Sequence, residues 1–124
     1  MNLSKKNTTR TGNHGEKLTM DFLVNKGYQL LDKNYRFKKF EIDLIVQDNL
    51  TLVFVEVKYR SSDAFCQPWQ AVTRTKQKQI IHVANHYIQS KALDNEVRFD
   101  VVGIVAKENE IQFDHIQGAF YPIS

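Results

Sequence analysis

The sequence predicts an α/β fold in which helices pack on a mixed β-sheet. Two stretches repeat apolar residues at helical spacing, near residues 13–27 and 68–91. Stretches rich in β-branched residues lie between and after them, at 41–47, 50–60 and 96–106. The order is a helix, a hairpin with flanking strands, a long helix and more strands. This order favours one sheet with helices on its faces.

The first predicted element is a helix that starts near Asn13. Residues 1–12 before it are basic, polar and without periodicity, so we expect a flexible basic arm. Asn13 is a good N-cap, and Glu16 stands three residues later, where a capping box has its acid. Gly27 ends the helix. Residues 13–124 are then expected to form a single domain.

The next elements are strands. A short strand is predicted at 28–31, and the basic stretch 33–39 follows it. Residues 41–47 and 50–60 both read as strands, and the turn signal Asp48-Asn49 between them predicts an antiparallel hairpin. Both faces of these strands are largely apolar, which indicates a sheet covered on both sides.

A second helix is predicted from Pro68, a residue suited to the first turn, to about Lys91. A strand at 96–106, a turn at 107–109 and a last strand at 110–116 complete the chain. No internal repeat and no linker interrupts this order.

Composition narrows the classes of protein. The 124 residues hold one cysteine, which excludes an intrachain disulfide and a cysteine-rich zinc site. No apolar run approaches the ~20 residues of a membrane span, and the N-terminus is unlike a secretory signal, so we expect a cytoplasmic protein. Residues 1–91 carry 15 basic and 8 acidic side chains, and residues 92–124 carry 2 and 6. The basic part would attract a polyanion, although an unevenly charged surface explains it equally well.

Two charged residues end a very apolar strand. Glu56 and Lys58 are two positions apart, so they share one face of the strand. Asp43 on the partner strand is placed by the hairpin register. A two-residue turn sets Asp43 diagonal to Glu56, and a four-residue turn sets the two opposite each other. An odd loop would set them on opposite faces.

Carboxylates on one face predict a metal site. They repel each other unless a cation lies between them, and Mg²⁺ prefers oxygen ligands. Asp43 and Glu56 are therefore candidate ligands of Mg²⁺ or Mn²⁺, with Glu16 as a third ligand. Such a metal activates water and binds phosphate, and Lys58 would stabilise the transition state. The alternatives are a metal-free ion pair of Lys58 with either acid, and a capping role for Glu16.

The pattern of Asp43 followed by Glu56-Val57-Lys58 resembles the D…(D/E)xK signature of PD-(D/E)XK nucleases. Glu16 on a preceding helix is similar to the arrangement in archaeal-type Holliday-junction resolvases. Across most of its length the chain resembles the bacterial YraN family, through GNHGE (12–16), EIDLIV (41–46), LVFVEVKYR (52–60), QPWQAV (67–72), Lys76 and RFDVVGI (98–104).

The resemblance implies a restriction-endonuclease-like fold, a mixed sheet flanked by helices. It also implies a metal-dependent endonuclease acting on DNA, including branched or structured DNA. Asp43, Glu56 and Glu16 would bind the metal, and Lys58 and Glu16 would be catalytic. Resolvases of this fold are symmetric dimers, so a homodimer is an expectation as well.

Three cations are candidates for contact with nucleic acid. Lys76 lies between apolar positions of the second predicted helix, and Arg74 and Arg60 lie near the two ends of the connecting loop. Glu41 shares a strand face with Asp43 and is interpreted as a peripheral acid, with a role as a substitute ligand as the alternative. Two further interpretations stay open: a catalytically silent nucleic-acid-binding module and a protein-interaction scaffold.

Overall fold

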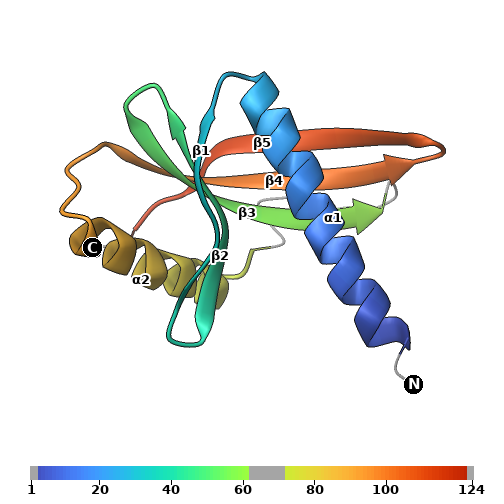
Figure 1. Ribbon diagram of the computed structural model, residues 1–124, viewed down its shortest axis with the longest axis horizontal. Helices are drawn as coiled ribbons and strands as arrows, with labels where there is room; N and C mark the ends of the chain where they lie inside the picture. Colours follow the sequence, from blue (N-terminus) through green and yellow to red (C-terminus); the bar gives the residue numbers. More distant parts are fainter. Residues whose placement is uncertain (1–2, 62–71, 123–124) are drawn as a thin grey trace.

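The computed structural model describes residues 3–61 and 72–122, with side chains described in 14–59 and 72–122. The described part has two helices and five strands: α1 (Leu3–Asn25), β1 (Gln29–Phe37), β2 (Phe40–Asp48), β3 (Thr51–Ser61), α2 (Arg74–Ser90), β4 (Val97–Lys107) and β5 (Glu110–Phe120). The strands form one sheet in the order β1-β2-β3-β4-β5 (Figure 1). Only β3 and β4 pair in parallel among the described strands. The predicted α/β mixed sheet is confirmed.

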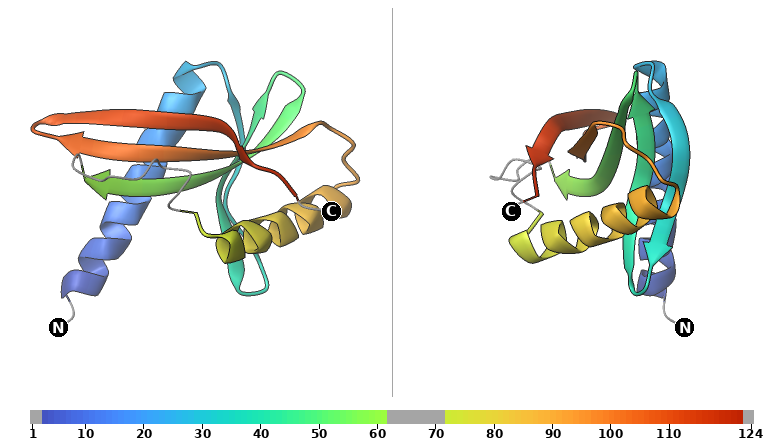
Figure 2. Two further views of the ribbon diagram at one scale, coloured as in Figure 1. Left: turned by 180° about the vertical axis from the view of Figure 1, so that it is seen from behind. Right: turned by 90° about the vertical axis from the view of Figure 1, so that its left-hand side faces the viewer.

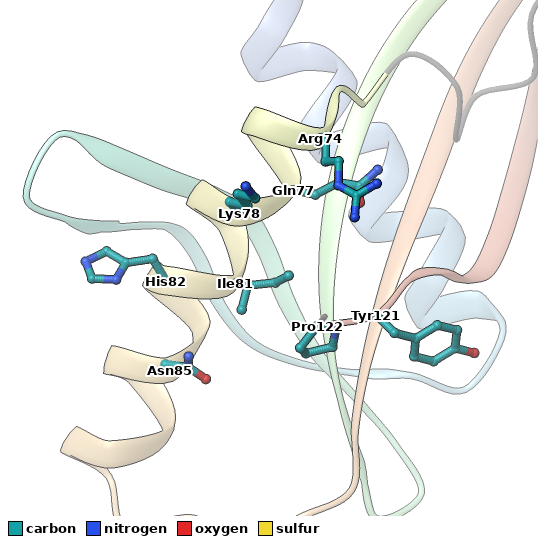
Figure 3. Close-up of a pocket in the computed structure, with 8 residues that line it drawn as sticks. All are labelled: Arg74, Gln77, Lys78, Ile81, His82, Asn85, Tyr121 and Pro122. Atoms are coloured by element: carbon teal, nitrogen blue, oxygen red, sulfur yellow. The ribbon is translucent and has the colours of Figure 1, made fainter. Parts of the chain in front are cut away.

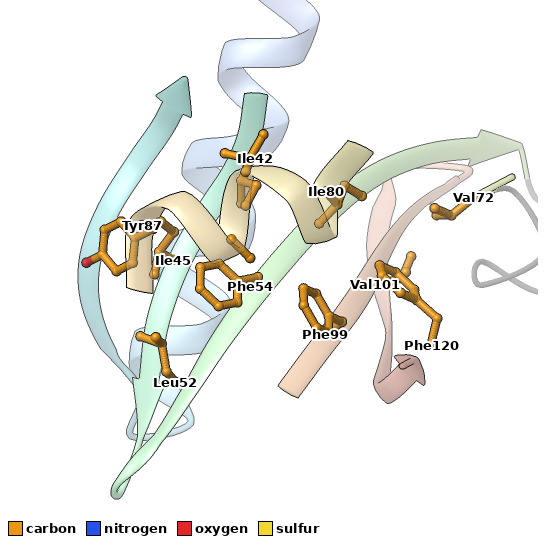
Figure 4. Packing of buried hydrophobic residues seen from close by; sticks show 12 residues of the cluster. Ile42, Ile45, Leu52, Phe54, Val72, Ile80, Tyr87, Phe99, Val101 and Phe120 are labelled. Carbon is orange, nitrogen blue, oxygen red and sulfur yellow. The ribbon is translucent and has the colours of Figure 1, made fainter. Parts of the chain in front are cut away.

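The two helices cover opposite faces of the sheet (Figure 2). On the α2 face, Phe54 and Phe99 stack with their ring centroids 5.5 Å apart, and Phe99 continues the row to Phe120 (Figure 4). On the α1 face, Leu23 packs against Val53 and other strand residues. Burial of each such side chain contributes about 1.5–3 kcal/mol. The double covering explains why both faces of β2 and β3 are apolar.

Strands β2 and β3 separate at one end, and we call this opening the fork. Their ladder runs from Asp48 opposite Thr51 to Leu44 opposite Val55. Beyond it, β2 stays paired with β1 as far as Phe40, while β3 stays paired with β4 as far as Ser61. The β1–β2 hairpin accordingly turns away from β3 (Figure 1). The turn residues are Asn49 and Leu50, and this register corresponds to the predicted alternative in which Asp43 faces Glu56.

Helix α1 begins at Leu3, so the prediction of a helix start near Asn13 is wrong. Extending an existing helix costs no new nucleation, which lets polar residues continue it. The first turns of α1 project beyond the sheet (Figure 1). Glu16 therefore lies inside the helix, and the capping-box interpretation is wrong. The other end is as predicted, because Gly27 adopts φ +96° and Tyr28 N–H donates to the Leu23 carbonyl at 3.0 Å.

Helix α2 begins at Arg74 rather than at Pro68, which lies outside the described residues. Thr73 is its N-cap, and its hydroxyl accepts a hydrogen bond from the Lys76 N–H at 3.1 Å. The C-terminal end, with Lys91 as the cap, agrees with the prediction. Neither described helix is long and apolar enough to cross a membrane.

Candidate functional site

The carboxylate of Asp43 lies in the fork, between the separating strands β2 and β3. Its Oδ2 accepts a hydrogen bond of 2.7 Å from the backbone N–H of Val57. Past the last paired residues, Leu44 and Val55, this N–H has no partner in the β2–β3 ladder. The carboxylate takes the place of the missing carbonyl, because a buried N–H needs an acceptor. The divergence of two strands thus fixes the orientation of this acid.

Glu56 lies across the fork from Asp43 and is 7% exposed. The negative charge of Glu56 acts on the Asp43 carboxyl group, so the two acids influence each other's ionisation. The Lys58 Nζ is 4.0 Å from Glu56 Oε1. Glu56 Oε2 is buried and has no hydrogen-bond partner among the described atoms. A buried carboxylate oxygen without a partner is costly unless something positive approaches it.

Two more acids complete what we call the carboxylate cluster: Glu16, Glu41, Asp43 and Glu56. Oxygen atoms of Glu16, Glu41 and Asp43 all lie within 4.8 Å of one another. Glu41 lies two positions before Asp43 on β2 and shares its strand face, as predicted, and this places Glu41 in the cluster rather than at its periphery. Its second oxygen accepts a 2.9 Å hydrogen bond from Arg36.

Asn34 holds the outer acids together, and the sequence pattern did not identify it. Its Nδ2 donates to Glu16 Oε2 at 2.6 Å and to Glu41 Oε1 at 2.8 Å. The backbone of Asn34 has φ +50°, a conformation that asparagine tolerates better than most residues. An asparagine inside a strand was the only sequence signal, since strands are depleted in this residue.

Gly15 lets α1 approach the sheet closely enough to deliver Glu16. A Cβ at this position would lie 2.4 Å from the ring of Tyr59 on β3. Glycine is otherwise unfavourable within a helix. Its place next to Glu16 therefore serves the close contact between α1 and β3.

The acids of the cluster resist joint ionisation. Burial, and then the negative charge of Glu56, raises the pKa of Asp43 to about 8, against the opposing hydrogen bond from Val57. Burial also raises the pKa of Glu56, although the charges of Lys76 and Lys58 oppose the rise. The cluster therefore favours a bound proton or a cation at neutral pH.

The donor set fits a hard divalent cation. Mg²⁺ and Mn²⁺ take carboxylate oxygens, and Glu16, Glu41 and Asp43 offer three within a short span. These three residues could hold such an ion. Of the predicted ligands, Asp43 and Glu16 belong to this group, and the charge of Glu56 acts on Asp43 from beside it.

The three cations predicted to contact nucleic acid do not lie together in the described part of the structure. Lys76 faces the cluster, since its charge acts on Glu56. Arg74 instead lines a pocket of about 280 Å³ between α2 and the residues that follow β5 (Figure 3). The other residues of that lining are Gln77, Lys78, Ile81, His82, Asn85, Tyr121 and Pro122. The side chain of Arg60 lies outside the described residues.

The remaining polar candidates have structural partners. Arg98 pairs with Asp100 at 2.9 Å. His115 contacts Asp100 at 2.7 Å. His82 and His86 lie against the Phe37 ring at 5.4 and 3.7 Å between centroids.

The fold and the cluster define an α/β protein whose five-stranded mixed sheet is consistent with a restriction-endonuclease-like fold and whose acids could bind a metal ion. The chain belongs to the Uncharacterised protein family UPF0102, whose sequence model matches residues 15–104. This is the YraN family that the motifs predicted.

Relatives from distant bacteria match over most of their length. A UPF0102 protein of Flavobacterium psychrophilum is 41% identical over 110 residues, which cover 89% of this chain and 92% of the relative. One of Chlorobium chlorochromatii is 42% identical over 120 residues, covering 92% and 93%. One of Clostridioides difficile is 42% identical over 115 residues, covering 92% and 99%.

Proposed function

We propose that this chain is a Mg²⁺- or Mn²⁺-dependent endonuclease-like protein that hydrolyses phosphodiester bonds of DNA. The observation that carries the proposal is the carboxylate cluster in the fork. Three acids have oxygens within 4.8 Å of one another, and Glu56 adds a buried oxygen without a partner. The charges of Lys58 and Lys76 act on Glu56. This combination suits a cation and an anionic substrate better than a structural ion pair.

Each residue of the site has a defined part in the proposed reaction. Asp43, Glu56 and Glu16 bind the metal, and Val57 N–H keeps the Asp43 carboxylate oriented. The metal, when bound, supplies an activated water and positive charge beside the phosphate. Water attacks phosphorus, one P–O bond breaks, and the leaving oxygen takes up a proton. Lys58 stabilises the negative charge that develops on the phosphate oxygens.

Metal titration by calorimetry tests the first part of the proposal. We expect one Mn²⁺ site in the wild type and its loss in Asp43→Asn and in Glu56→Gln, because each variant removes a ligand charge. Glu96→Gln is the matched control, since this acid is exposed and lies outside the cluster. Unchanged Mn²⁺ binding in both cluster variants would overturn the metal site.

Cleavage assays test the second part. Single-stranded, duplex, flap and four-way-junction DNA are incubated with Mg²⁺ or Mn²⁺. We expect Lys58→Ala to bind metal nearly as well as the wild type but to cut about 10²–10³-fold more slowly. A wild-type protein that binds metal and cuts none of these substrates would contradict the proposed activity.

The second candidate function is a module that binds nucleic acid without cutting it. The pocket on α2 favours it, because Arg74 and Lys78 line that pocket and no acid does. Among the described residues, neither side chain has an acidic partner. Salt-sensitive DNA binding that persists in Glu56→Gln, with no cleavage by the wild type, would select this function.

A further inference from the structure

A pocket of about 520 Å³ adjoins the carboxylate cluster on the side of α1. Its lining consists of Glu16, Lys17, Met20, Lys33, Asn34 and Leu44. Glu16 is a member of the cluster and also lines the pocket. Asn34 lines the pocket as well and donates a hydrogen bond of 2.6 Å to Glu16. A ligand in the pocket would therefore lie next to a phosphate held at the cluster.

The lining combines exposed cations with apolar surface. Lys17 and Lys33 are exposed, and neither ammonium group has an acidic partner in the described part of the chain. Met20 is half-buried and supplies the apolar surface, above the buried Leu44 of the apolar cluster under α1. Ammonium groups bind phosphate, and a flexible thioether packs well against rings of varied shape. The ligand that fits has an anionic group and a flat ring, as a nucleotide does.

The size of the pocket selects an unpaired nucleotide. Pockets of about 300–1,000 Å³ hold small molecules, and the volume here of about 520 Å³ lies within that range. It equals a cube about 8 Å on each side, whereas the major groove of duplex DNA alone is about 12 Å wide. A base that enters must therefore have left its partner strand, at an energetic cost that is least where no partner exists.

We propose that this pocket receives one unpaired nucleotide of the DNA strand, next to the phosphate bound at the carboxylate cluster. The inference rests on the proposed function and names its substrate class: DNA with an unpaired nucleotide at the cleaved position, as in a single strand, a flap or a branch point. Met20, the apolar side chain of the lining that is not fully buried, offers the base only a weak acceptor, so little base preference is expected.

Fluorescence of 2-aminopurine, a base analogue, tests the proposal by binding rather than cleavage. The full chain is titrated, with Ca²⁺ present, into oligonucleotides that carry the analogue in a single strand, at a flap junction or inside a duplex. We expect the emission of the unpaired analogue to change on binding and that of the paired analogue to stay constant. Equal responses for the paired and unpaired analogues would overturn the proposal.

Charge reversal locates the response. Lys17→Glu and Lys33→Glu should each weaken binding of the single-stranded probe by about tenfold, because each removes a phosphate contact. Lys91→Glu makes the same charge change at the far end of α2 and should have a much smaller effect. The two test positions lie on different elements, so a variant that fails to fold leaves the other to decide. If Lys91→Glu weakens binding of the probe as much as Lys17→Glu and Lys33→Glu each do, the pocket assignment is wrong.

The outcome separates the pocket from the catalytic proposal. A response of the unpaired analogue that persists in Glu56→Gln, in a protein that cuts no DNA, supports the pocket and rejects the nuclease. Cleavage of continuous duplex as fast as of flap DNA, without any response of the analogue, rejects the pocket and leaves the nuclease.

Discussion

Asp100 is a fully buried carboxylate with an unusually complete set of donors. Arg98 donates to it from two nitrogens, at 2.9 and 3.0 Å, and the Gly118 N–H donates at 3.0 Å. The His115 ring adds a 2.7 Å contact. Burial alone would raise the pKa of Asp100, but the hydrogen bonds from His115, Arg98 and Gly118 outweigh burial and lower it. The ionised form is therefore part of the folded state.

We predict that Asp100→Asn lowers the free energy of unfolding at pH 7 by about 2–4 kcal/mol, because Arg98 loses its charged partner. Since the folded pKa is lowered, the stabilisation is complete above the unfolded pKa of about 3.9 and is lost as pH falls through the folded value. Urea unfolding at pH 7, 5 and 3.5 should show the gap between variant and wild type narrowing at the lowest pH. Asp94→Asn, at an exposed position, is the control. A gap independent of pH would contradict the prediction.

Asn34 acts on the cluster through its two acid partners. We predict that Asn34→Gly weakens Mn²⁺ binding by about 10–100-fold, the usual cost of removing a residue that orients ligands. Glycine tolerates the backbone φ of +50°, so the change removes only the amide. Asn49→Gly is the matched control, because Asn49 has φ +54° and lies in the β2–β3 turn away from the acids. Calorimetry that finds equal affinity in both variants would contradict the prediction.

At the scale of elements, α2 depends on Thr73 for its start. We predict that Thr73→Ala lowers the free energy of unfolding by about 1 kcal/mol, because the Lys76 N–H loses its acceptor. Thr75→Ala changes the same side chain at an exposed position in the first turn and should be neutral or slightly stabilising. Denaturant unfolding of the two variants measures the difference. Equal stability would mean that Thr73 does not cap the helix.

The element order was predictable because apolar periodicity is a local property of the chain. The starts of the helices were not predictable in the same way. Helix α2 begins after its N-cap Thr73, and α1 continues through the polar residues before Asn13. Asp43, Glu56 and Lys58 were predictable as a group because one hairpin carries them. Glu41 was predictable as a neighbour of Asp43 from the two-residue spacing on one strand, but Asn34 was not, because it reaches the acids from a left-handed backbone conformation in β1.

At the scale of the molecule, positive charge is concentrated in residues 1–91, with a net charge of +7, whereas residues 92–124 have −4. We predict that DNA affinity falls steeply with salt and that removing Arg74 and Lys78 together lowers the salt slope by about 2. Lys107→Ala, in the acidic part of the chain, should leave the slope nearly unchanged. Fluorescence anisotropy between low and moderate salt measures the slopes. If the salt dependence of DNA affinity has the same slope in all variants, the DNA does not contact Arg74 and Lys78.

The parallel pairing of β3 with β4 divides the chain into two parts that come together through a non-local contact. Every acid of the carboxylate cluster lies in α1 or in the β1–β2–β3 meander, whose strand contacts are close in sequence. The pairing of β3 with β4 must instead close a long loop that includes α2, and such non-local contacts form slowly. During folding, the acids can thus be gathered before the sheet is complete. The β4–β5 hairpin can then dock against a part of the molecule in which the carboxylate cluster has already formed.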